Sequence, residues 1–183
     1  EIRLSLVGSE MCIRDRFEDI SLQQGIRQIL YPYEEMEVLN PEWEVILKDI
    51  IDSLFEQMSD EEYNILNEEF GTYMVSRAYE YRQLLEYLVF RYFAKSIYDY
   101  DFLGKCQMLV TNFFVIRQMD IIRWLDNHRE YSFKDRMDVV HIFSRQVEYS
   151  EDNIENLYED FIFDDIFKTD NLIAILWIDS ENI

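Results

Sequence analysis

Three residues in VVHIFSRQVEY could form a polar site: His141, Arg145 and Glu148. Their spacing of four and three residues places them on one face of an α-helix. An imidazole exchanges protons near neutral pH, and a guanidinium with a carboxylate can bind a polar substrate. The same spacing suits a plain surface ion pair between Arg145 and Glu148 beside a partly buried His141. We expect that simpler arrangement, and the polar site stays open as the alternative.

Arg91 is a second candidate, within the aromatic run EYLVFRYFAKSIYD. An arginine inside a long apolar helix needs a carboxylate or an aromatic ring to receive its charge. We expect a buried ion pair with Asp99 or Asp101 that holds two segments together. The alternative is the wall of a substrate cleft, which Arg91 forms with tyrosines such as Tyr98.

A group of carboxylates follows at Glu148, Glu151, Asp152 and Glu155. Metal sites in helical bundles use Glu-x-x-His pairs from separate helices, and no histidine follows Glu148 at that spacing. We therefore interpret these residues as a solvated helix start and expect no metal site. Catalytic residues stay unassigned, because the chain has no glycine-rich phosphate loop, no G-x-S-x-G and no H-E-x-x-H.

Helices must position these residues, since Gly (4) and Pro (2) are scarce. Capping signals predict where helices begin, at Asn40-Pro41, Ser59 with Glu62, Asp101, Ser132 and Ser150. We expect Pro32 to end the first helix, Gly71 to break or bend another, and a long helix to cover 72–98. The predicted fold is an all-α, irregular bundle of about seven helices with short connections.

The net charge of −21 repels nucleic-acid phosphates and anionic membranes, so we expect neither as a partner. A hydrophobic content of 49% is too high for a disordered acidic tail. The apolar stretches are too short to span a bilayer, which favours a cytoplasmic protein. Beyond residue 16, Cys106 stands alone. We expect a buried structural thiol, because one cysteine cannot by itself build a disulfide, a zinc site or an iron–sulfur cluster.

The first residues differ from the rest of the chain. The stretch LVGSEMCIRDR, at 6–16, has no helical or strand period, and the charges of residues 1–16 cancel. It resembles the translated adapter of a transposase-based sequencing library. We therefore interpret residues 1–16 as a non-native segment and place the start of the domain at residue 17.

Three segments carry a resemblance to a known family: EEMEVLNPEWEVIL (34–47), EYLVFRYFAKSIYDYDFLGK (86–105) and FSRQVEYSEDNIENLYEDF (143–161). They resemble the C-terminal half of the bacterial flagellin lysine-N-methylases, in order across residues 33–177. The resemblance implies methylation of flagellin lysine side chains in the bacterial cytoplasm. It also implies S-adenosylmethionine and an iron–sulfur cluster, bound by a cysteine-rich region upstream. Residues 17–183 would then be the helical C-terminal portion of a larger enzyme, inactive alone, with flagellin and that N-terminal half as partners.

The resemblance suggests that the YLVFRYF helix borders the substrate cleft. The candidate substrate-binding residues are Arg91, Tyr98, His141, Arg145 and Glu148. Methyl transfer needs a neutral ε-amine, and Tyr98, His141 or Glu148 could accept its proton. The competing interpretation is a non-enzymatic acidic helical interaction or dimerisation domain, such as the effector half of a transcriptional regulator. An upstream cysteine cluster would favour the methylase, and an upstream helix-turn-helix the regulator.

Overall fold

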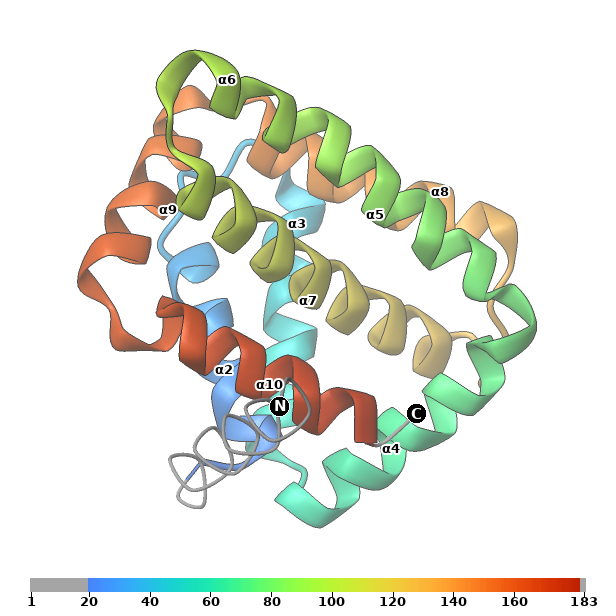
Figure 1. Cartoon of the computed structure of the whole chain (residues 1–183). Coiled ribbons are helices and arrows are strands. Elements are labelled where there is room, and N and C mark those ends of the chain that lie inside the picture. The colour runs from blue at the N-terminus through green and yellow to red at the C-terminus, as the bar shows by residue number, and fades with distance from the viewer. Residues whose placement is uncertain (1–19, 182–183) are drawn as a thin grey trace.

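The computed structural model describes residues 20–181, with side chains to residue 176, and the predicted non-native segment 1–16 lies outside them. The α-helices are α2 (Leu22–Glu34), α3 (Pro41–Ile50), α4 (Asp60–Met74), α5 (Ala78–Tyr92), α6 (Ser96–Asp99), α7 (Phe102–Asp126), α8 (Phe133–Phe143), α9 (Glu151–Phe163) and α10 (Thr169–Glu181). Short π-helices, η1 (Ile51–Glu56) and η4 (Ser144–Glu148), extend α3 and α8. Single 3₁₀ turns form η2 (Val75–Arg77), η3 (Phe93–Lys95) and η5 (Asp165–Phe167). No strand occurs between residues 20 and 181, and the predicted all-α bundle is confirmed (Figure 1).

The predicted helix starts are confirmed, because each cap is a local contact. Ser59 and Glu62 form a full capping box, in which the backbone N–H of Ser59 donates to Glu62 at 2.9 Å. Ser132 and Asp135 form a second box at the start of α8. Single side-chain caps begin α3, α7 and α9, at Asn40, Asp101 and Ser150.

The predicted helix breaks are wrong. Pro32 lies inside α2, which continues to Glu34. Proline has no backbone N–H, but near the end of the helix this removes only one helical hydrogen bond, and the proline ring is buried. Gly71 lies inside α4, where the buried face of the helix continues to Met74. The break comes at η2 instead, so the range 72–98, predicted as one helix, holds the end of α4, then η2, α5, η3 and most of α6.

Helix α7 lies at the centre of the bundle (Figure 1). It packs against α2, α3, α5, α8, α9 and α10. Most of its polar residues are therefore buried as well and need partners inside the protein. The hydroxyl of Tyr33 donates to Asn112 Oδ1 at 2.7 Å, and that of Tyr63 donates to Gln118 Oε1 at 2.9 Å.

One buried glutamine fixes the segment that precedes α3. The side chain of Gln146, in η4, accepts hydrogen bonds from the backbone N–H groups of Leu39 and Asn40, at 2.9 and 3.2 Å. Its amide donates to the carbonyl of Glu37 at 2.7 Å. Asn40 thus has a fixed position relative to α8, and α3 begins beside that helix.

Candidate functional site

Arg91, on α5, forms an ion pair with Glu148, at the end of η4. Arg91 Nε lies 3.8 Å from Glu148 Oε1, and Nη2 donates to the Glu148 backbone carbonyl at 3.4 Å. The Glu148 side chain is only 3% exposed, whereas that of Arg91 is 31% exposed. The predicted arginine–carboxylate pair therefore exists, but its acid comes from a residue 57 positions later. The predicted partners Asp99 and Asp101 are wrong, since both contact Lys105, at 2.9 and 3.8 Å.

The Glu148 carboxylate accepts three further hydrogen bonds. The donors are the hydroxyls of Tyr87 at 2.7 Å, Tyr92 at 3.1 Å and Ser144 at 2.7 Å. Burial, together with the hydrogen bond and charge of Glu148, raises the pKa of Tyr87 to about 12. Burial and Glu148 also raise the pKa of Tyr92. Both tyrosines therefore stay protonated donors at neutral pH, and the side-chain oxygens of Glu148 are occupied by contacts within the protein.

His141, Arg145 and Glu148 do not share a face, because η4 widens the last turn of this helix. A π-helical turn advances fewer degrees per residue than an α-helical turn, and it rotates Glu148 toward the core. His141 and Arg145 are exposed. The predicted surface ion pair between Arg145 and Glu148 is wrong, and so is the solvated position of Glu148. Glu151, Asp152 and Glu155 are exposed, as predicted.

His141 and Arg145 instead line a groove of about 710 Å³ between α3, α7 and α8. Apolar side chains from all three helices line it: Val45, Ile46, Met119, Ile122 and Ile142. Four carboxylates line it as well: Glu42, Asp49, Asp126 and Asp138. Arg123 is the other cation, so the groove carries more negative than positive charge. We name this site the α3–α8 groove.

A second hollow, of about 540 Å³, shares His141 and Arg145 with the α3–α8 groove. Leu39, Ser144 and Tyr149 complete its lining. The side chain of Tyr149 is 79% exposed and forms an aromatic wall. The two hollows therefore lie on either side of His141 and Arg145, which line both.

Tyr98, the fifth predicted site residue, lies on α6 and is 85% exposed. Within residues 20–181 it has no hydrogen bond to Arg91 or Glu148. The structure therefore brings Arg91 together with Glu148, and His141 together with Arg145, and it leaves Tyr98 outside both pairs.

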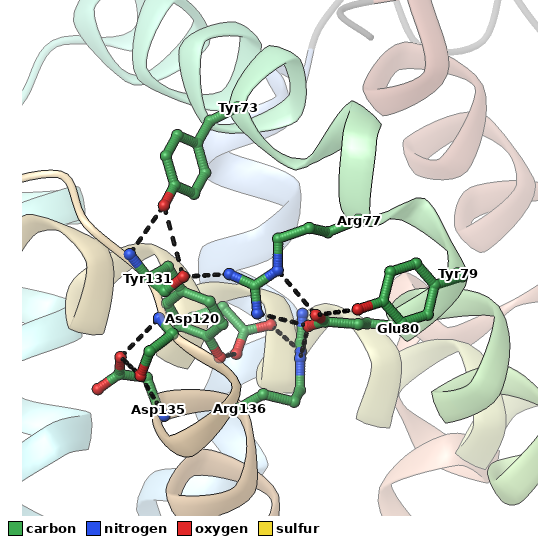
Figure 2. A network of polar contacts seen from close by, with 9 residues as sticks. Tyr73, Arg77, Tyr79, Glu80, Asp120, Tyr131, Asp135 and Arg136 are labelled. Atoms are coloured by element: carbon green, nitrogen blue, oxygen red, sulfur yellow. Dashed lines mark hydrogen bonds and ion pairs between the residues drawn. The ribbon is translucent and has the colours of Figure 1, made fainter.

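A further polar cluster was not predicted from the sequence (Figure 2). At its centre is Asp120 of α7, which is fully buried. Its carboxylate accepts from the hydroxyl of Tyr81 at 2.7 Å, from the hydroxyl of Tyr131, and from Arg136 Nη1. The guanidinium of Arg136 also lies over the ring of Tyr81, 4.3 Å from its centroid. The signal in the sequence is an aspartate directly flanked by apolar residues, in the run Met119-Asp120-Ile121-Ile122 of α7.

Glu80 extends this cluster to the start of α5. Its carboxylate lies 3.5 Å from Arg136 Nε and accepts from Arg77 Nε and Nη2, at 2.7 and 2.9 Å. Arg77 also donates to the backbone carbonyl of Tyr131. Figure 2 shows the side chains of Arg77, Glu80, Asp120 and Arg136 converging from η2, α5, α7 and α8. Two arginines balance two carboxylates, so the cluster joins helices and offers no unbalanced charge to a ligand.

The donors present do not fit a metal cluster. No three His, Cys, Asp or Glu side chains among residues 20–176 are grouped as metal ligands. Cys106 is half-buried, and burial raises the pKa of its thiol, which disfavours the thiolate form. In the same range, no helix has both the length and the hydrophobicity that crossing a membrane requires.

Comparison with protein families gives a match to the FliB lysine N-methylase C-terminal domain over residues 10–175. The chain belongs to this family. No curated protein and no solved structure matches it. The span of the FliB C-terminal domain includes all three segments that carry the resemblance. It also includes every predicted site residue, from Arg91 to Glu148. The match begins at residue 10, and the boundary at residue 16 stays a prediction.

Proposed function

We propose that this chain is the C-terminal part of an enzyme that methylates lysine side chains of flagellin. The observation that carries the proposal is the match to the FliB lysine N-methylase C-terminal domain over most of the chain. The acidic surface supports it, because a charge of −21 attracts a cationic lysine-bearing substrate. We place the reaction in the bacterial cytoplasm, before flagellin is exported.

We further propose that S-adenosylmethionine and an iron–sulfur cluster are bound by a cysteine-rich region of the parent enzyme. An iron–sulfur cluster needs several thiolates, and Cys106 is the single cysteine beyond residue 16. The role of the helical domain is then to pack against that region and to shape the flagellin site. The Arg91–Glu148 pair is a positioning element in this scheme, since it ties α5 to η4.

The test is a methylation assay on the full-length parent protein. The purified parent is incubated with monomeric flagellin and S-adenosylmethionine, and peptide mass spectrometry locates methyl-lysine. An unrelated protein of similar lysine content serves as the substrate control. Methyl-lysine in flagellin alone is the expected result.

A folded parent protein that leaves flagellin unmodified would overturn the methylase assignment. Sedimentation of the same sample then tests the alternative, because a dimerising regulator would be a stable dimer without any flagellin. A methylase that does not depend on dimerisation would produce methyl-lysine in flagellin whether it is a monomer or a dimer.

A further inference from the structure

We propose that two copies of this chain associate through an exposed apolar surface at the corner between α5 and α7. The inference goes beyond the proposed function, because it concerns the assembly of the chain and no step of it involves flagellin. Three features of this corner carry it: the area of apolar surface, a backbone fixed by local contacts, and a charge that differs from that of the whole chain.

The exposed apolar side chains of this corner are neighbours in sequence and in space. They come from the last turn of α5, from α6 and the residue after it, and from the first turn of α7. Each is more than half exposed, and together we name them the α6 corner: Phe90, Ile97, Tyr98, Tyr100, Phe102 and Leu103. The rings of Phe93 and Phe102 are in contact, with centroids 4.4 Å apart, so the two ends of the segment meet. Figure 1 shows α6 at an outer corner of the bundle.

The α6 corner has the area that a dimer interface needs. Phe90, Tyr98 and Tyr100 are 80%, 85% and 89% exposed. Since an aromatic side chain can bury about 150–250 Å², these three rings offer about 500 Å², and all six side chains offer roughly 800 Å². The largest apolar patch of a typical monomer covers only about 300–600 Å². A stable interface takes about 800 Å² from each partner, and a two-fold contact uses the same patch on both copies.

Local contacts fix the backbone that carries these side chains. Tyr100 has a φ of 59°, in the left-handed region, and its N–H donates to the carbonyl of Ser96 at 3.0 Å. Asp99 Oδ1 accepts from the backbone N–H of Asp101 at 3.1 Å, and Asp99 Oδ2 lies 2.9 Å from Lys105 Nζ. The corner therefore holds its exposed rings in place before a partner arrives, and association costs little ordering of the backbone.

The charge of the α6 corner suits a contact between two acidic chains. Each copy carries a charge of −21, so most contacts between copies would bring carboxylates together. No acidic residue lies between Glu86 and Asp99, whereas Arg91 and Lys95 do. The two aspartates that follow contact Lys105. Two copies can therefore bury this surface against each other without bringing unbalanced carboxylates together.

The position of the corner favours a second copy over the upstream region of the parent enzyme. In Figure 1, α6 lies at the opposite end of the bundle from the start of α2. A segment that leads into α2 therefore reaches the bundle away from the corner. A cationic partner is also a poor occupant, because the carboxylates at the corner already contact a lysine. A second copy supplies an equal apolar area with the same balance of charge.

The experiment measures the mass of the full-length parent protein in solution by analytical ultracentrifugation, and it compares two double variants. Phe90→Glu with Ile97→Glu places two charges in the α6 corner. Phe133→Glu with Ile65→Glu makes the same two exchanges at exposed positions of α8 and α4, so the net charge changes equally. Circular dichroism and urea unfolding check that both variants fold.

We expect the wild-type parent to be a dimer at about 10 μM, and the corner variant to raise the dimer Kd at least about a hundredfold, because two central apolar contacts are lost. The matched variant should change the Kd by less than about threefold, through long-range charge alone. A lysine-reactive cross-linker should join Lys95 of one copy to Lys95 of the other. Such a link between identical residues can form only between two copies.

A parent protein that stays monomeric up to about 100 μM would overturn the proposal. If the 183-residue chain dimerises and the parent does not, the upstream region of the parent covers the corner, and the proposal falls as well. Equal dimer Kd values for the two double variants would place the interface on another surface and would have the same consequence. Because none of these measurements uses flagellin, a failure of the proposed function leaves each result unchanged.

Discussion

Replacing Asp120 with asparagine should destabilise the chain by about 3 kcal/mol. The substitution keeps the shape of the side chain but removes a fully buried charge that Arg136 contacts directly. Removing one partner of a buried ion pair costs about 3–5 kcal/mol, because the other charge stays buried and uncompensated. The lower end applies here, since Glu80 remains 3.5 Å from Arg136 and the asparagine oxygen can still accept from one tyrosine.

Equilibrium unfolding in urea measures this loss. With a slope of ~2 kcal/mol/M, the midpoint should fall by about 1.5 M while the slope stays unchanged. The control is Asp126→Asn, an exposed carboxylate on the same helix, which should change the unfolding free energy by less than ~0.5 kcal/mol. If Asp120→Asn were no worse than this control, the buried cluster would not be what joins α5, α7 and α8.

A double variant tests whether the loss of stability in Asp120→Asn comes from an unpaired buried charge or from altered packing. Asp120→Leu with Arg136→Leu removes both charges, and Glu80 keeps its contacts with Arg77 at 2.7 and 2.9 Å. We expect the double variant to be more stable than Asp120→Asn alone, because no unpaired charge remains buried. The reverse order would show that packing, and not charge, accounts for the loss.

Three further predictions concern other contacts. Arg91→Ala should lower the unfolding free energy by only about 1–2 kcal/mol, because Glu148 still accepts hydrogen bonds from three hydroxyl groups. The activity of the parent enzyme per folded molecule should stay unchanged. A lower activity per folded molecule would place Arg91 at the substrate. Because the folded-state pKa of Tyr87 is raised to about 12 from 10.0, its stabilising contribution is complete below pH 10 and is lost as pH rises through 12. A tyrosinate absorbance titration should show this, and Glu148→Gln should lower that pKa. Hydrogen bonds from the Ser59 backbone and hydroxyl lower the pKa of Glu62, so its contribution is present above about 4.5 and is lost at more acid pH. Ser59→Ala should raise the pKa of Glu62 part of the way back toward 4.5, which an NMR titration of the carboxyl group would measure. An unchanged pKa would mean that the backbone N–H of Ser59 alone lowers it.

The helix starts and the fold class were predictable because they depend on contacts between near neighbours. Ser59 and Glu62 are three residues apart, so the capping box is visible in the sequence. The helix breaks were not predictable in this way. Gly71 and Pro32 lower helix propensity locally, but burial against the rest of the bundle outweighs that cost.

The candidate site was predictable only in part. Sequence spacing identified Arg91, His141, Arg145 and Glu148, and it correctly expected a carboxylate partner for Arg91. Its choice of partner was wrong, because Glu148 lies 57 residues away and periodicity says nothing about contacts at that distance. The π-helical turn at η4 had no sequence signal, yet it turned Glu148 away from His141 and Arg145.

The sequence by itself therefore determined the fold class, the helix starts with their caps, the acidic charge and the family of the chain. Tertiary structure alone decided which charges meet. Asp120 contacts Arg136 because α7 is enclosed by its neighbours, and an enclosed carboxylate must find its cation on another helix. A second long-range contact lies beside the α3–α8 groove, where Gln146 accepts hydrogen bonds from the backbone just before α3. Such contacts depend on packing over long sequence separations, which local pattern does not encode.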